Sequence, residues 1–78
     1  MTNQTKLEQN SQELRFIRVR EAVKKTGLSK STIYDLMASG RFPQSVRLSA
    51  RTVAFIESEV DQWMVDRVTA ARGTLRAA

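Results

Sequence analysis

The spacing of apolar positions changes twice along the chain, and each spacing predicts a different kind of element. Over residues 16–39 apolar side chains recur at helical intervals, interrupted at Gly27, which predicts two short helices joined by a tight turn. Over residues 46–55 apolar and polar side chains alternate, as they do in a half-buried hairpin. Helical spacing returns over residues 57–72. The pattern therefore predicts a mainly α-helical fold with one small β-hairpin.

The predicted helix pair has clear signals at its ends. An apolar run at residues 16–19 suits a brief strand or the start of a first helix, which continues over residues 20–26. Gly27 follows this helix and can adopt the left-handed conformation that commonly ends one. Ser29 is a good N-cap for a second helix over residues 30–39. One side of that helix is apolar and should face the core, whereas the opposite side carries Ser31, Tyr34, Asp35 and Ala38.

The segment after the second helix predicts a hairpin in the position of a wing. Pro43 blocks continuation of the helix, so Phe42 and Pro43 should form a packed corner. One face of the hairpin is expected to be buried, and its tip is expected at residues 49–51. The expected buried face consists of Val46, Leu48, Val53 and Phe55, which alternate with Arg47, Thr52 and Ala54.

The last apolar stripe predicts a third helix that lies across a small core. Ser58 is its predicted N-cap, and the neighbouring acidic residues suit the positive end of the helix dipole. Trp63 is expected to anchor the fold, with the stem of Arg67 covering its ring. Gly73 should end this helix. The stripe itself consists of Val60, Trp63, Met64, Arg67 and Val68.

The length and composition narrow the classes of function. A chain of 78 residues holds one small domain, expected over residues 15–73 between a flexible tail over 1–14 and a frayed end over 74–78. The chain has no Cys and no His, which removes disulfides, ordinary zinc sites, thiol chemistry and the commonest general base. We therefore interpret the acids at residues 57–61 as first-turn acids. We expect no enzyme, cofactor, metal site or small-molecule ligand.

Basic residues are concentrated in one part of the chain. The sequence carries 13 Lys and Arg against 8 Asp and Glu, a net charge of +5. Residues 15–51 contain nine of these bases and two acids and so carry +7, whereas residues 52–78 carry −1. This segregation favours a polyanionic partner such as nucleic acid. No apolar run approaches the about 20 residues that cross a bilayer, so we expect a cytoplasmic protein without a membrane partner.

A helix pair joined by a glycine turn and followed by a hairpin is the pattern of a winged helix-turn-helix, whose second helix enters the major groove of double-stranded DNA. The predicted recognition residues are Ser29, Lys30, Ser31, Thr32, Tyr34 and Asp35. The predicted wing and flanking contacts are Arg18, Lys25, Arg41, Arg47 and Arg51. At this point two other classes stay open: a protein-interaction module that uses the third helix, and, with less support, an RNA-binding module.

The order and spacing of several motifs resemble the AlpA-like family of phage regulators over residues 16–67. The shared segments are IRVRE, TGLSKSTIY, GRFP, VRL, and ESEV followed by Trp63. The resemblance implies a winged helix related to MerR-type regulators and phage excisionases, carried by a prophage or integrative element and located on bacterial DNA. It implies sequence-specific transcriptional regulation, for example of an integrase gene. The alternative is an excisionase that binds and bends attachment-site DNA.

Two features depart from the family pattern. Asp35 stands where a basic residue is common, and Ser49 and Ala50 stand at the hairpin tip where Gly and Pro are common. An acid facing DNA repels phosphate, but Asp35 can instead accept a hydrogen bond from a cytosine amino group or pair with a basic side chain of the protein. Because one short site gives little specificity, we expect a homodimer or cooperative binding by neighbouring protomers.

Overall fold

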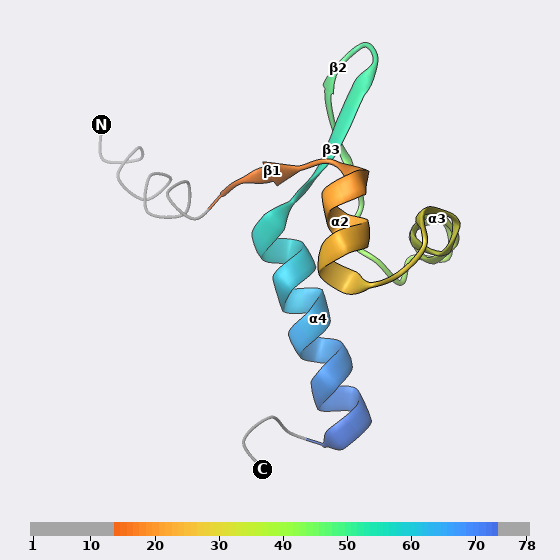
Figure 1. Ribbon diagram of the computed structural model, residues 1–78, viewed down its shortest axis with the longest axis vertical. Coiled ribbons are helices and arrows are strands. Elements are labelled where there is room, and N and C mark those ends of the chain that lie inside the picture. The colour runs from red at the N-terminus through yellow and green to blue at the C-terminus, as the bar shows by residue number, and fades with distance from the viewer. Residues whose placement is uncertain (1–13, 74–78) are drawn as a thin grey trace, which may run out of the picture.

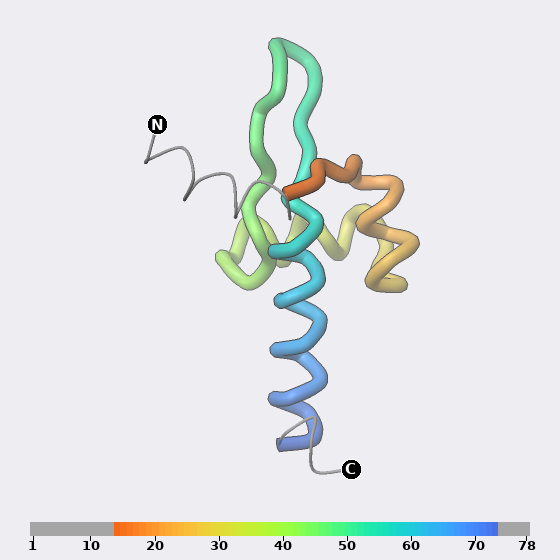
Figure 2. Tube along the Cα trace, turned by 90° about the vertical axis from the view of Figure 1, so that its left-hand side faces the viewer, coloured from red at the N-terminus to blue at the C-terminus, as the bar shows by residue number. Residues whose placement is uncertain are grey.

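The computed structural model describes residues 14–73 and folds them into three helices and a small antiparallel sheet (Figure 1). The order is β1 (Phe16–Ile17), α2 (Val19–Thr26), α3 (Lys30–Ala38), β2 (Val46–Ser49), β3 (Thr52–Ile56) and α4 (Glu57–Arg72). The central strand is β3, and the hairpin of β2 and β3 projects from the helices as a wing (Figure 2). The predicted winged-helix architecture is confirmed. The predicted tails lie outside the described residues, except for Leu14.

The turn between α2 and α3 follows from local backbone chemistry. Gly27 takes a φ of 79°, and its N–H donates to the Val23 carbonyl at 2.8 Å, which ends α2 at the predicted place. The hydroxyl of Ser29 then accepts a hydrogen bond from the backbone N–H of Thr32 at 3.1 Å. This bond satisfies one of the free N–H groups of the first turn, so the predicted N-cap is confirmed.

The end of α3 redirects the chain into the core. Gly40 has a φ of 74°, and its N–H donates to the Met37 carbonyl at 3.0 Å. The N–H of Arg41 reaches back to the Leu36 carbonyl at 2.7 Å, which completes a Schellman turn. The next residue, Phe42, is buried. The predicted corner after α3 is therefore a packed one.

The core lies where the three helices meet the sheet. The ring of Phe42 meets Phe55 and Trp63 edge-on, with centroid separations of 5.6 Å and 4.9 Å. Trp63 also donates from Nε1 to the Arg41 carbonyl at 2.8 Å, and the guanidinium of Arg67 lies 5.8 Å from the centroid of its indole ring. Trp63 thus anchors α4 to the loop after α3, as predicted. The buried core residues are Ile17, Ala22, Ile33, Phe42, Phe55 and Val60.

The register of the wing corrects the predicted buried face. Val46 pairs with Ala54, and Arg47 pairs with Val53. Because cross-strand partners share a face and neighbours along a strand alternate, Val46 lies on the face opposite Val53 and not beside it. A β-bulge follows Arg47, where the pairing shifts by one residue before the turn. Simple alternation assumes an unbroken register, and the bulge breaks it.

Burial along the wing also differs from the prediction. Ala54 and Phe55 are adjacent in β3 and both buried, so the base of this strand is covered on both faces. Leu48 and Val53, which were expected in the core, lie further out and are 42% and 37% exposed. A wing that projects beyond the core has nothing to bury its outer apolar residues against.

The junction of β3 and α4 corrects a second prediction. Helix α4 begins at Glu57, so Ser58 lies inside the first turn and is not the N-cap. Ile56 occupies the cap position without a side-chain hydrogen bond. The N–H of Glu57 instead donates to the Arg15 carbonyl at 2.7 Å, so the chain before β1 satisfies a group that a capping side chain would otherwise satisfy. Gly73 ends the helix, as predicted.

Candidate nucleic-acid interface

Helix α3 has one face in the core and one in solvent. Ile33 is buried, and the expected exposed face, made of Ser31, Tyr34, Asp35 and Ala38, is exposed throughout. Tyr34 is 41% exposed, so its ring and hydroxyl are accessible on this face. Within residues 14–73 no basic side chain forms an ion pair with Asp35. The Asp35 carboxylate is therefore available to accept hydrogen bonds from another molecule.

Two of the predicted recognition hydroxyls also hold the start of α3. The Ser29 hydroxyl accepts from the N–H of Thr32 and donates to its Oγ1 at 2.8 Å. These bonds fix the direction in which α3 leaves the turn. Lys30 and Ser31, the next two residues, are exposed and make no side-chain hydrogen bond within the described part of the chain. The cap thus presents Lys30 and Ser31 from a fixed first turn.

The wing carries its two arginines close to the turn. Arg47 donates from Nη1 to the Ala50 carbonyl at 3.2 Å, which holds its guanidinium along the tip. Arg51 lies in the turn itself, and both arginines are exposed. The turn consists of residues 50–51, one residue shorter than predicted. The structure therefore places both predicted wing cations at the outer end of the hairpin.

Lys25 has a structural role that the charge pattern did not predict. Its Nζ lies 2.8 Å from Oδ1 of Asp61 and 3.0 Å from Oε2 of Glu57, both in the first two turns of α4. The hydrogen bond to Asp61, followed by that to Glu57, raises the pKa of Lys25. Its side chain is 25% exposed, whereas the other bases of residues 15–51 are exposed. Two carboxylates already hold this ammonium, so Lys25, unlike the other predicted cations, is ion-paired within the described part of the chain.

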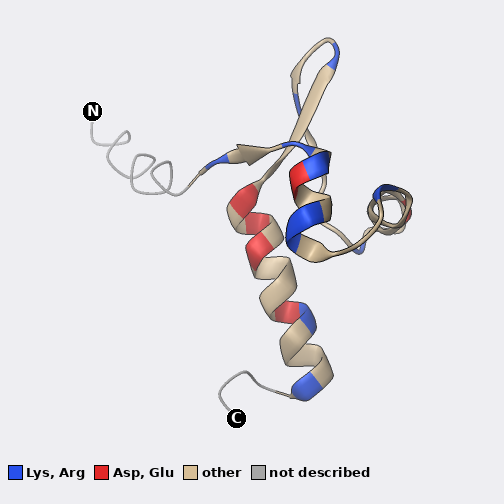
Figure 3. Ribbon diagram, in the orientation of Figure 1, with Lys and Arg blue, Asp and Glu red and all other residues tan. Residues whose placement is uncertain are grey.

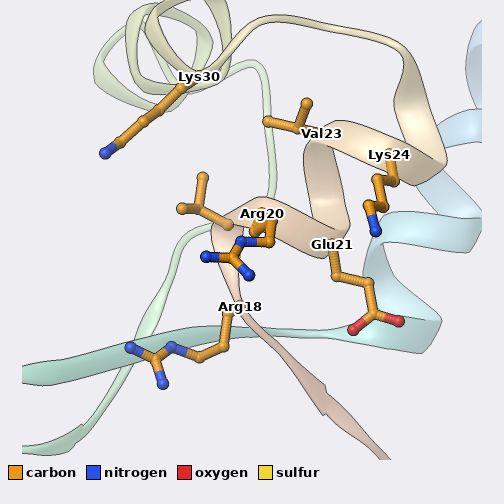
Figure 4. A pocket seen from close by; sticks show the side chains of 7 residues that line it. Arg18, Arg20, Glu21, Val23, Lys24 and Lys30 are labelled. Carbon is orange, nitrogen blue, oxygen red and sulfur yellow. The ribbon is translucent and has the colours of Figure 1, made fainter.

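A surface hollow lies between the start of α2 and the start of α3 (Figure 4). Four cations and one carboxylate line it, together with two valines. Two of these cations, Arg20 and Lys24, were not among the predicted site residues. The density of bases at residues 18–30 was the signal that could have indicated them. The lining residues are Arg18, Val19, Arg20, Glu21, Val23, Lys24 and Lys30.

Arg41 lies in a different setting from the other predicted cations. Its Nε donates to the Ser39 hydroxyl at 3.2 Å, and its side chain stays exposed. It shares a shallow groove with Glu59 and Asp66 of α4. The structure thus brings Arg18 and Lys30 together at one hollow and keeps Arg41 beside acidic residues.

Basic and acidic residues are distributed unevenly over the elements. Figure 3 shows basic segments on the wing, on α2 and at the start of α3, and acidic segments gathered in the first turns of α4. A local positive field steers and binds a polyanion. Among residues 14–73 there is no group of three His, Cys, Asp or Glu side chains that could hold a metal ion. Nor does this part of the chain contain a helix long and apolar enough to span a membrane.

Comparison with known proteins yields one family and two relatives. Residues 15–68 match the family described as Prophage CP4-57 regulatory protein (AlpA). The uncharacterized protein ORF88 of Enterobacteria phage P4 is 48% identical over 54 residues, which is 69% of this chain and 61% of the phage protein. The DNA-binding transcriptional activator AlpA of Escherichia coli (strain K12) is 31% identical over 64 residues, which is 74% of this chain and 91% of that protein. The matched segment thus spans less than two thirds of the phage P4 protein.

Proposed function

Because this chain belongs to the AlpA family of prophage regulatory proteins, we propose that it is a transcriptional regulator that binds double-stranded DNA at specific sequences. The observation that carries the proposal is the exposed polar face of α3 together with the exposed cations at the starts of α2 and α3 and at the wing tip. The Escherichia coli relative, named a DNA-binding transcriptional activator, supports the assignment to transcription. The proposed activity is binding, with no chemical step.

In this proposal the exposed face of α3 lies in the major groove, whose width of about 12 Å admits one helix. The small side chains of Ser31 and Ala38 allow the backbone to approach the DNA closely. Tyr34 and Asp35 reach base edges, where Asp35 accepts a hydrogen bond from a cytosine amino group. Lys30, Ser31 and the N–H groups of the first turn contact phosphate.

The remaining proposed contacts are to the DNA backbone. Arg47 and Arg51 at the wing tip bind phosphates beside the groove that α3 occupies. Arg18 contributes charge at the start of α2, and Arg41 contributes it beyond the end of α3. Ser29 and Thr32 serve the interface by holding the first turn of α3. These groups supply affinity and orientation, whereas the face of α3 supplies the choice of sequence.

One short helix contacts few base pairs, so we propose that two or more protomers bind together. Repeated or inverted half-sites would be occupied by a homodimer or by neighbouring protomers on the DNA. Sedimentation of the protein alone and of its DNA complex distinguishes these two arrangements. A single protomer on a single site at saturation would contradict both.

The proposal is tested by titrating the full chain against duplex fragments from its own genetic element. The fragments cover the promoters and the attachment ends, and each titration is made at two salt concentrations with competitor DNA. We expect tight binding that survives competitor and is confined to a promoter, such as one upstream of a recombinase gene. Binding confined to repeated sites in an attachment end, together with bending of that DNA, would contradict the regulator and indicate an excisionase. Loss of all binding in competitor would contradict sequence specificity and direct attention to a protein partner of α4.

A further inference from the structure

The hollow between α2 and α3 concentrates more positive charge than any one element does alone. Arg18 is the N-cap of α2, Arg20 is in its first turn, and Lys30 is the first residue of α3. Figure 4 shows that these three side chains reach toward the same side of the hollow, whereas Lys24 and Glu21 extend on the other side. The start of α2 and the start of α3 therefore place three cations on one side of the hollow.

These three cations have no internal partner within the described residues. The ion pairs of this part of the chain involve only Arg15 and Lys25, which are held by Glu57 and Asp61. Arg18, Arg20 and Lys30 are all exposed. Like charges brought together without counterions repel each other, and a bound anion relieves that repulsion. The acids of α4 neutralise Lys25, whereas the four cations of the hollow share one lining carboxylate, that of Glu21.

We propose that this hollow binds one backbone phosphate of the DNA and that Arg20 is a phosphate-binding residue. The inference rests on the proposed function and adds a contact that neither the wing nor the exposed face of α3 provides. A guanidinium offers paired N–H donors that match two phosphate oxygens, and Lys30 supplies a point charge from the adjacent helix. Because α2 and α3 both line the site, a phosphate held there fixes the distance of α3 from the DNA backbone.

The loss of a phosphate contact affects the binding affinity in a recognisable way, because the phosphates are the same at every base pair. Losing Arg20 should weaken binding to the operator and to unrelated DNA by the same factor. Each phosphate contact releases one counterion and contributes about 0.9 to the slope of log K against log salt. Its loss should therefore lower the affinity about eightfold at about 0.1 M salt. Glu21 lies at the same hollow and opposes the phosphate, so its neutralisation should tighten binding by about twofold.

The experiment compares variants that change the net charge equally at different places. Arg20→Gln is matched by Arg72→Gln at the far end of α4, and Glu21→Gln is matched by Glu59→Gln. All four side chains are exposed, so none of these changes disturbs the core, and circular dichroism checks that each variant folds. The affinities of the full chain are measured for operator and unrelated duplexes across a series of salt concentrations.

We expect Arg20→Gln to lower the affinity for both duplexes about eightfold relative to Arg72→Gln. We expect it also to flatten the slope of log K against log salt by about 0.9. We also expect Glu21→Gln to bind more tightly than Glu59→Gln. Equal affinities within either matched pair would overturn the phosphate site while leaving the proposed function intact. A wild-type chain that binds no duplex at low salt would overturn the proposed function itself.

Discussion

Ser29 shows how much of the interface depends on a single hydroxyl. It closes the first turn of α3 through the N–H of Thr32, and removal of such a cap costs about 1 kcal/mol of stability. We therefore expect Ser29→Ala to lower the free energy of unfolding by about 1 kcal/mol in urea denaturation. Ser31→Ala, an exposed serine in the same turn, is the control and should change it little. Equal losses in the two variants would show that the cap is not the cause.

Tyr34 tests the assignment of the recognition face. If its ring and hydroxyl reach base edges, Tyr34→Ala should cost about 1 to 3 kcal/mol in binding to the operator and leave binding to unrelated DNA nearly unchanged. Val65→Ala provides a matched control, because Val65 is 39% exposed on α4 and Tyr34 is 41% exposed on α3. Competition binding with both duplexes measures the ratio of the affinity for the operator to the affinity for unrelated DNA. A uniform loss on both duplexes would place Tyr34 on the phosphate backbone.

At the scale of elements, α2 and α4 share the hydrophobic core and are also joined by an ionic link. Lys25 joins the last turn of α2 to the first two turns of α4 through Asp61 and Glu57, and these bonds raise its pKa above 10.5. A raised lysine pKa means that the folded state holds the proton more tightly than the unfolded state does. This stabilisation is complete below the unfolded pKa and is lost as the pH rises through the folded pKa.

Lys25→Met should therefore destabilise the domain at about pH 7, because it leaves Asp61 without a cation and Glu57 with the more distant Arg15 alone. Above the raised pKa, wild-type Lys25 loses its proton and the difference between the two proteins should shrink. Urea denaturation at a series of pH values, from about pH 7 to above the pH at which Lys25 titrates, measures this difference. Lys24→Met, an exposed lysine at the neighbouring position, controls for the loss of one charge. A difference that stays constant over this pH range would contradict the ionic role.

The elements also show what the sequence could and could not predict. The end of α2 and the start of α3 were predictable, because Gly27 ends α2 and Ser29 caps α3 through backbone bonds to residues only a few positions away. The register of the wing was not, since a bulge after Arg47 shifts the pairing without any signal in the alternation. The cap of α4 was misassigned to Ser58 because the group that satisfies Glu57 is a carbonyl 42 positions earlier in the chain, that of Arg15.

The same distinction holds for the candidate site. The exposed face of α3 followed from helical geometry alone, because a residue's direction on a helix is fixed by its position. The pairing of Lys25 with α4 could not be predicted, since it joins residues 32 and 36 positions apart. The hollow likewise forms only when two helices pack. The sequence therefore could not predict that Arg20 and Lys30 line the same hollow.

The whole molecule determines how strongly binding depends on salt. The proposed phosphate contacts number about four, one at the hollow formed by Arg18, Arg20 and Lys30 and one each at Arg41, Arg47 and Arg51, and they predict a slope of about −3.6 in log K against log salt. Titration of one operator duplex from low to moderate salt measures the total slope, and division by the number of protomers bound at saturation gives the slope for each protomer. A slope shallower than about −2 would show that most of these cations do not reach the DNA.

The direct junction of β3 and α4 has a mechanical consequence. No loop separates the strand of the wing from the long helix, and the Glu57 N–H is tied to the Arg15 carbonyl at that point. No flexible linker therefore lies between β3 and α4. A displacement of the base of β3 passes directly to the first turn of α4, without an intervening loop that could absorb it.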